Sequence, residues 1–298
     1  MKSRRSILGL AIALLAAISS FPAAAQILYK IEKSGLKPSY IFGTHHMAPL
    51  SILDSIPAVQ SALDETEAVV GELDMTGGQS QIALAMMKYA QAPADSTFSR
   101  LLTPEKFVEV NDALASLLGM PDSLVGFNQM RPMVVTALVT LAITRNTLPG
   151  YTEGEQLDSY FQQEAVAFDK PVIGLETPDR QAQLLYTSMP IDAQLRSLLE
   201  LISRPEAGVE GLAELYQAYR AGDLDKLLVL SNEEGATPEE RAFMKQLLDQ
   251  RNADWLKLLP GILAERPVFI AVGAAHLPGP GGLLQGLRDA GFTVTPEN

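Results

Sequence analysis

The segment Pro267-Val-Phe-Ile-Ala-Val-Gly-Ala-Ala-His276 joins an uninterrupted apolar run to a glycine turn and a histidine. The run Val268–Val272 contains no polar residue, which predicts a strand that is buried on both faces. Strands of this kind are typical of parallel sheets that are covered by helices. The segment therefore indicates an α/β fold with His276 just beyond the carboxyl end of a strand.

The same pattern occurs three more times along the chain. In each case an apolar run meets a glycine and, within one to three residues, a potential ligand or acid–base group. The three segments are Ile41-Phe-Gly43-Thr-His-His46, Val69-Val-Gly71-Glu72 and Ile173-Gly174-Leu-Glu176. Ligands of open α/β sheets bind at the carboxyl ends of the strands, where glycine permits a close approach. All three histidines of the chain lie in these turns, which predicts one site at this edge.

Apart from Val268–Val272, five segments are strand candidates, and they come from both sides of a long helical stretch. They are Ile27–Ile31, Ser39–Phe42, Ala68–Val70, Pro171–Ile173 and Phe292–Thr295. Between residues 79 and about 167 the helical period dominates, and prolines interrupt it. Because the strands enclose the helices, we expect one α/β domain over residues 26–298. Its central sheet is mixed, largely parallel and built from strands of both chain ends, with a large helical insertion at about residues 77–168.

Composition excludes several classes of protein. The chain has 298 residues, 47% of them apolar, and no cysteine, so it is neither a thiol enzyme nor a zinc ribbon. Its 23 Lys and Arg against 35 Asp and Glu give a formal net charge of −12. No cluster of basic residues follows Arg5, so nucleic acid is not expected as a partner.

The first 25 residues carry the pattern of an export signal. Basic residues up to Arg5 precede an apolar stretch, Ile7–Ile18, and the small residues Ala23-Ala-Ala25 stand before Gln26. The stretch of 12 residues is shorter than the roughly 20 that span a bilayer. We therefore expect a signal peptide cleaved near Ala25. The mature protein is then periplasmic or secreted, with no stable membrane insertion.

The strand-end residues suit a metal site. Two neutral imidazoles and one or two carboxylates form a ligand set for Zn²⁺, Mn²⁺ or Co²⁺ with a position left for water. We expect His46, His276 and Glu72 as ligands. Glu72 and Glu176 are the expected catalytic carboxylates, one of them acting as general base. His45 and His46 point to opposite faces if both are extended, so His46 is the preferred ligand.

Simpler interpretations remain open for each residue. A histidine after a strand commonly bonds a loop carbonyl, Glu72 suits a solvated turn, and Glu176 suits a helix start. Arg251 lies on an apolar helical stripe, where an arginine usually extends to solvent. If it is instead buried it needs a carboxylate, which Glu72, Glu176 or a substrate could supply.

Taken together, these turns resemble the TraB/GumN family, which includes the Tiki metalloproteases. The matching residues are Gly43, Thr44 and His46 for G-T-x-H, Glu72 for the acid after the second strand, Lys170 to Thr177 with Gln181, the pair Arg251-Asn252, and Gly273 to His276 for the closing G-x-x-H. The resemblance implies a fold similar to the erythromycin-esterase and haem-binding ChaN-like superfamily. It also implies metal-dependent peptide hydrolysis through the two histidines and a glutamate. Arg251, Asn252, Thr44 and Gly273 are the expected substrate-binding or supporting residues.

The favoured hypothesis is a metal-dependent hydrolase, with a peptidase as the favoured kind and a peptide or small molecule as substrate. A second hypothesis is a periplasmic protein that binds haem or another small ligand without turnover. A metal-free, glutamate-assisted esterase is a third.

Overall fold

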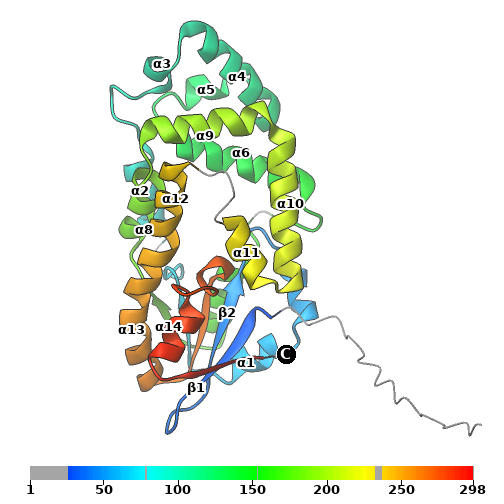
Figure 1. Ribbon diagram of the computed structural model, residues 1–298, viewed down its shortest axis with the longest axis vertical. Coiled ribbons are helices and arrows are strands. Elements are labelled where there is room, and N and C mark those ends of the chain that lie inside the picture. Colours follow the sequence, from blue (N-terminus) through cyan, green and yellow to red (C-terminus); the bar gives the residue numbers. More distant parts are fainter. Residues whose placement is uncertain (1–25, 78, 153, 232–236, 298) are drawn as a thin grey trace, which may run out of the picture.

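The computed structural model describes residues 26–77, 79–152, 154–231 and 237–297 (Figure 1). The predicted signal peptide, residues 1–25, lies outside this range and stays a prediction. Within the described ranges, no helix is both long enough and apolar enough to cross a membrane.

The described residues form a six-stranded sheet with the order β4-β3-β5-β2-β1-β6. The strands are β1 Leu28–Glu32, β2 Ser39–Thr44, β3 Ala68–Gly71, β4 Val172–Gly174, β5 Val268–Gly273 and β6 Thr293–Pro296. Neighbours from β4 to β2 are parallel, whereas β1 is antiparallel to both β2 and β6. The mixed, largely parallel sheet built from both chain ends is confirmed, and β5 lies between β3 and β2.

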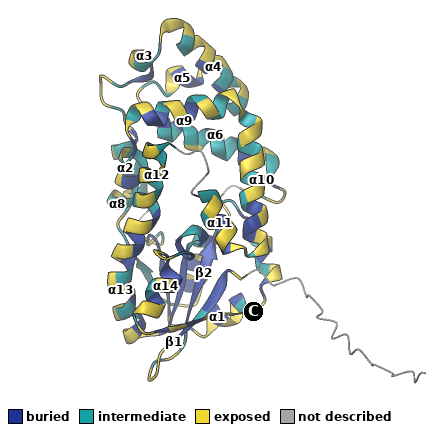
Figure 2. Cartoon of the chain, in the orientation of Figure 1, coloured by how far each residue is buried: buried dark blue, intermediate teal, exposed yellow. Residues whose placement is uncertain are grey.

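The central strands are buried on both faces, which explains why their sequences are apolar without alternation. Ile41, Phe42, Phe269 and Ile270 have no exposed surface, and Figure 2 shows the sheet as mostly buried. The rings of Phe42 and Phe269 both pack against Phe161 of helix α7, with centroids 5.1 and 4.8 Å away. This aromatic cluster fixes α7 against the sheet.

Helices fill the connections between the strands. From the start of the chain to β4 they are α1 Ala58–Asp64, α2 Gln79–Ala90, α3 Phe98–Leu101, α4 Pro104–Leu118, α5 Ser123–Gly126, α6 Pro132–Thr147 and α7 Leu157–Ala167. After β4 come α8 Pro178–Thr187, α9 Ile191–Ser203, α10 Pro205–Ala221, α11 Leu224–Ser231, α12 Pro238–Lys245, α13 Arg251–Glu265 and α14 Leu283–Asp289. Several begin at proline, whose missing N–H is not needed in a first turn.

The helical end of the molecule has a hydrophobic core of its own, at a distance from the sheet (Figure 1). Its buried residues are Phe98, Val110, Leu114, Leu124, Val135, Val139, Ile143 and Leu198. Leu198 belongs to α9, which follows β4 in sequence. The insertion at about residues 77–168 therefore buries its apolar face only together with a helix from outside it.

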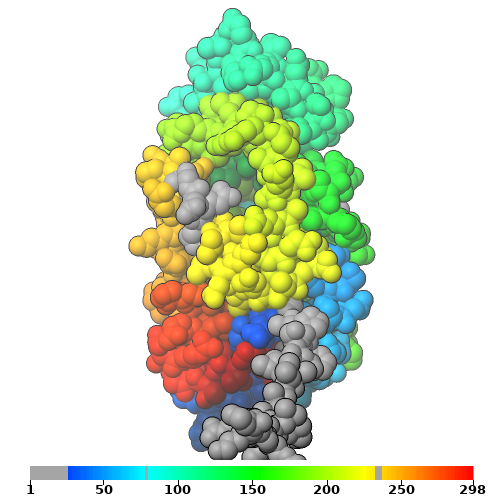
Figure 3. Space-filling model, turned by 45° about the vertical axis from the view of Figure 1, so that its right-hand side comes forward, coloured from blue at the N-terminus to red at the C-terminus, as the bar shows by residue number. Residues whose placement is uncertain are grey.

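Helices α10 and α11 connect this helical end to the sheet, and Figure 3 shows them between the two ends of the molecule. The hydroxyl of Tyr219, near the end of α10, donates a 2.9 Å hydrogen bond to the carbonyl oxygen of Gly43 in β2. The carboxyl end of β2 is thereby tied to a helix that comes from the far end of the fold.

Candidate functional site

The four glycine turns meet at one edge of the sheet. The register pairs Thr44 with Gly273, Gly71 with Gly174 and Gly71 with Ala271, so the carboxyl ends of the four strands lie within two residues of one another. Packing there leaves no room for larger residues. A Cβ atom on Gly71 would lie 2.6 Å from Nε2 of Gln162, and one on Gly174 would lie 2.7 Å from a backbone nitrogen.

Arg251 is at the centre of the charged residues at this edge. Its Nη2 donates to Oε2 of Glu72 and to Oε1 of Glu176, both at 2.5 Å. Its Nε lies 3.1 and 3.2 Å from the two carboxylate oxygens of Glu176. The side chain is only 5% exposed, so the usual expectation that an arginine on such a stripe extends to solvent is wrong here. The buried alternative, with carboxylate partners, is what the structure shows.

A local distortion of the helix precedes Arg251. Residues Gln246–Gln250 form a π-turn between α12 and α13, and such wide turns frequently occur at functional sites. Nη1 of Arg251 donates to the carbonyl oxygen of Leu247 at 3.3 Å, and the guanidinium carbon lies 4.6 Å from the ring centre of Trp255. Groups of its own helical segment, Leu247 and Trp255, thus contact the guanidinium in addition to the two glutamates.

Glu72 is fixed by three different donors. Oε1 accepts the backbone N–H of Gly273 at 3.0 Å, and Oε2 accepts from Arg251 and from Nε2 of Gln181, the latter at 3.1 Å. The same Gln181 nitrogen donates to Oε1 of Glu176 at 3.1 Å. Burial raises the pKa of Glu72, but the charge of Arg251, the two nearby histidines and the N–H of Gly273 together outweigh burial and lower the pKa to about 2. Glu72 is therefore an anion at neutral pH.

His276 is buried behind Arg251, with both ring nitrogens engaged. Nδ1 lies 2.7 Å from Oδ1 of Asn252, whose Nδ2 donates to the carbonyl oxygens of His276 and Gly281. Because Asn252 Oδ1 is an acceptor, we assign the proton to Nδ1. Nε2 then accepts from Nη1 of Arg251 at 3.0 Å. Burial lowers the pKa of His276 to about 3, so the ring is neutral.

His46 is held in a different way. The hydroxyl of Thr44 donates to Oδ1 of Asp158 at 2.7 Å, and Nδ1 of His46 donates to Oδ2 of the same carboxylate at 2.9 Å. Among the described residues Nε2 of His46 has no hydrogen-bond partner. The Asp158 charge raises the pKa of His46 to about 9, although water screens this side chain, which is 61% exposed.

The neighbouring His45 turns to the opposite side, as expected for consecutive residues. Its ring packs on Tyr219 with centroids 5.1 Å apart, and its Nδ1 accepts the backbone N–H of Met47 at 3.2 Å. Burial lowers the pKa of His45 to about 4.

The cavities at this edge divide the predicted residues into two groups. One cavity of about 190 Å³ is lined by His46, Glu72, Leu73, Met75, Ile82, Gln156, Asp158, Gln162 and Gln181. A second, of about 250 Å³, is bordered by Glu176, Arg251 and Trp255. His276 lines neither. Of the two predicted ligand histidines, only His46 therefore faces a cavity that Glu72 also borders.

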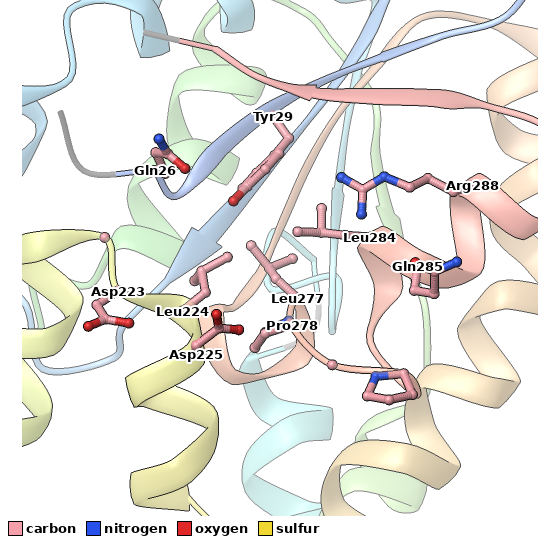
Figure 4. Close-up of a pocket in the computed structure, with 13 residues that line it drawn as sticks. Gln26, Tyr29, Asp223, Leu224, Asp225, Leu277, Pro278, Leu284, Gln285 and Arg288 are labelled. Carbon is pink, nitrogen blue, oxygen red and sulfur yellow. The ribbon is translucent and has the colours of Figure 1, made fainter. Parts of the chain in front are cut away.

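A larger cavity lies elsewhere among the described residues. It has about 720 Å³ and lies between β1, the start of α11 and α14, where Tyr29, Asp225 and Arg288 line it (Figure 4). None of the eight predicted site residues borders it.

The profile of the TraB/PrgY/gumN family matches residues 27–296, nearly the whole chain. The chain belongs to this family. Comparisons with curated proteins and with solved structures found no match. The resemblance seen in the glycine turns is confirmed at the level of the family. What this TraB/PrgY/gumN chain does must be inferred from its own site.

The sequence interpretation of this TraB/PrgY/gumN site missed Asp158 and underrated Gln181. Asp158 lies in the first turn of α7, where an acid is usually explained by the helix dipole. Gln181 lies within α8 and appeared only as a matching family position. Of the expected supporting residues, Thr44 holds Asp158, Asn252 holds His276 and Gly273 donates its N–H to Glu72.

The fit of a metal ion differs between the two histidines. In the part of the chain that the structure describes, no three His, Asp or Glu side chains are grouped to hold an ion. An ion at Nε2 of His276 would have to displace the guanidinium of Arg251. An ion at Nε2 of His46 displaces no protein group, and the carboxylate of Glu72 borders the same cavity. Nε2 of His46 is thus open to an ion, whereas Nε2 of His276 is not in this arrangement.

Proposed function

We propose that this protein is a hydrolase of peptide bonds and that its reacting centre is the cavity shared by His46 and Glu72. One observation carries the proposal. The hydrogen-bond chain from Thr44 through Asp158 orients the imidazole of His46 and leaves its Nε2 without a partner beside an anionic carboxylate. A carboxylate behind an imidazole is the usual support of both a catalytic and a metal-ligating histidine.

We further propose that His46 and Glu72 hold the divalent ion, with Mn²⁺, Co²⁺ and Zn²⁺ as the candidates. When bound, such an ion lowers the pKa of water to about 7 and polarises a carbonyl group. Glu72, with its pKa near 2, is by itself a weak base, so activation of water needs this additional help. Arg251 and Gln181 keep the Glu72 carboxylate in one orientation. Asp158 keeps a proton on Nδ1 of His46, and a bound ion would take the place of the second proton, on Nε2, that the pKa of about 9 implies at neutral pH.

The remaining residues act on these groups rather than on the substrate. Glu176 and His276 both contact Arg251 and thereby fix the guanidinium against Glu72. Glu176 borders the second cavity, so in this proposal it balances the charge of Arg251 instead of acting as a base. This narrows the earlier expectation, in which both glutamates were catalytic and His276 was a ligand.

The size of the cavity favours a peptide over an enclosed ligand. Pockets that enclose a small molecule measure roughly 300 to 1,000 Å³, whereas the His46–Glu72 cavity has about 190 Å³. A chain that lies across the sheet edge and presents one bond to the cavity fits this size better than haem does.

Ion binding and turnover can be tested together. We expect the chain from Gln26 onward to bind Mn²⁺ or Co²⁺ in calorimetric titrations, and His46→Ala and Glu72→Gln to lose this binding. His45→Ala, whose ring faces away from the cavity, is the matched control. We also expect cleavage of a quenched fluorescent peptide library that a chelator abolishes and Mn²⁺ or Co²⁺ restores.

Two results would change the proposal. If His46→Ala abolishes cleavage that a chelator leaves intact, the ion is not required and His46 acts as an acid–base residue. If His46→Ala binds metal and cleaves peptides as well as the unaltered chain, the site is wrong. A Soret band on adding haem that is lost with His46→Ala would favour the binding protein.

A further inference from the structure

A larger groove opens beside the His46–Glu72 cavity, between the loop after β3, helix α2 and helix α7. It has about 570 Å³ and is lined by Met75, Thr76, Ile82, Ala83, Ser159, Gln162, Gln163, Val166 and Ala167. Met75, Ile82 and Gln162 line the His46–Glu72 cavity as well. The two spaces are therefore adjacent and share a wall, so a molecule bound across one lies next to the other.

The lining of this groove is uncharged. None of its nine residues is ionisable, and Met75, Ile82, Ala83, Val166 and Ala167 present apolar side chains. A charged group placed there would lose water without gaining an ion partner, which is strongly unfavourable. An apolar group would instead gain from burial. The adjacent cavity differs, because the carboxylates of Glu72 and Asp158 border it.

The wall between the two spaces is rigid. The side chain of Gln162 is buried, and its Nε2 donates to the carbonyl oxygen of Leu73 while its Oε1 accepts the backbone N–H of Met75, both at 2.8 Å. Gln162 also packs directly on Gly71 at the end of β3. The groove is therefore held at a fixed position relative to Glu72, the residue that follows Gly71.

The groove is open and its apolar surface continues outward. Val166, which lines it, is 55% exposed, and Phe168 just beyond α7 is 62% exposed. Exposed apolar surface next to a polar cavity is typical of a binding site. Because the groove lies next to the cavity of the proposed reaction, the substrate is the occupant that its position supports.

We infer that the α2–α7 groove binds an apolar side chain of the substrate peptide, close to the bond that is hydrolysed. The inference rests on the proposed function and adds a substrate class to it: peptides with Phe, Leu or Met near the cleaved bond, and not peptides with Asp or Lys at that position.

Binding without turnover tests the groove separately from the chemistry. The probe is fluorescein-labelled Gly-Ala-Ala-Phe-Ala-Ala-Gly, with analogues that carry Ala or Asp in place of Phe. Fluorescence anisotropy is measured on the chain from Gln26 onward in the presence of a chelator. We expect the Phe peptide to bind about tenfold or more tightly than the Ala peptide, as burial of an aromatic side chain implies. The Asp peptide should bind most weakly.

A groove-filling variant gives the matched comparison. Ala83→Trp places an indole in the groove, whereas Leu84→Trp places one at the next residue of α2, which does not line it. We expect Ala83→Trp to abolish the preference for Phe and Leu84→Trp to keep it, with both variants retaining the far-ultraviolet circular dichroism of the parent. A peptide with benzoylphenylalanine at the Phe position should cross-link to residues 75–83 or 159–167.

The outcomes separate this inference from the proposed function. If the three peptides bind equally, or if Ala83→Trp keeps the Phe preference, the groove inference is wrong whatever the peptidase assay gives. If His46→Ala keeps the Phe preference and also has unchanged turnover, the proposed reacting centre fails while the groove stands.

Discussion

Replacing Arg251 by Met tests whether this arginine offsets the cost of burying the carboxylates of Glu72 and Glu176. The side chains of Glu72 and Glu176 are 10% and 7% exposed, and one guanidinium contacts both. The fall in the pKa of Glu72 from 4.5 to about 2 corresponds to about 3 kcal/mol, since each tenfold change in a dissociation constant is about 1.4 kcal/mol. Removing one partner of a buried ion pair usually destabilises by about 3 to 5 kcal/mol. We expect Arg251→Met to lose about that much at pH 7.

The sign of the pH dependence gives a second check. A carboxyl group whose pKa is lowered on folding stabilises the protein above about pH 4.5, and this stabilisation is lost as the pH falls toward 2. In Arg251→Met the Glu72 carboxylate stays buried but loses its main cationic partner, so its pKa rises and its protonation at lower pH stabilises the variant. The difference in unfolding free energy between parent and variant should therefore shrink from pH 7 to pH 4. Urea unfolding followed by circular dichroism at both pH values measures it.

Two controls sharpen the test. Arg196→Met removes an arginine from an exposed pair with Asp192 and should change stability little. Adding Glu72→Gln and Glu176→Gln to Arg251→Met removes the unpaired charges and should recover much of the loss. The reasoning is refuted if Arg251→Met loses less than about 1 kcal/mol, or if its loss grows at pH 4.

Three further changes have defined outcomes. Asp158→Asn should move the pKa of His46 from about 9 toward 6.5 in an NMR titration. It should also remove the stabilisation that the pair provides below about pH 6.5 and loses as the pH rises through 9. An unchanged pKa of His46 would contradict the contact. Gly71→Ala should destabilise the fold by about 1 to 3 kcal/mol because its methyl group meets Gln162. An unchanged melting temperature would show that the side chain of Gln162 can shift. Tyr219→Phe leaves a buried carbonyl without its donor and should lose about 1 to 3 kcal/mol, measured by urea unfolding.

The sheet was predictable from the sequence because each central strand is a short apolar run that ends in glycine. Local pattern and the position of the runs sufficed for the mixed, largely parallel sheet. The core of the helical part could not be predicted in the same way. The core around Phe98 needs Leu198 of α9, and nothing local to the 77–168 insertion indicates that a helix from a later connection completes it.

The candidate site was predictable where it depends on strand ends and not where it depends on helices. Glu72, Glu176 and His276 follow strands, so topology alone places them near one another. Asp158 comes from a helix start, and only the packing of α7 on the sheet brings it to His46. The apolar stripe already placed Arg251 on the inner face of its helix, but its contact with both Glu72 and Glu176 follows only from tertiary packing.

That π-turn at Gln246–Gln250 has a consequence for comparing family members. A wide turn holds about one more residue than an α-turn, so a straight late helix would be one residue shorter over this stretch. Deleting one residue there would close the wide turn to an α-turn of about 3.6 residues and leave the residues downstream in phase. Relatives with a single-residue gap between the positions of Lys245 and Arg251 should therefore keep their arginine on the same side of the helix, and alignments that place the gap elsewhere will pair residues that are not equivalent.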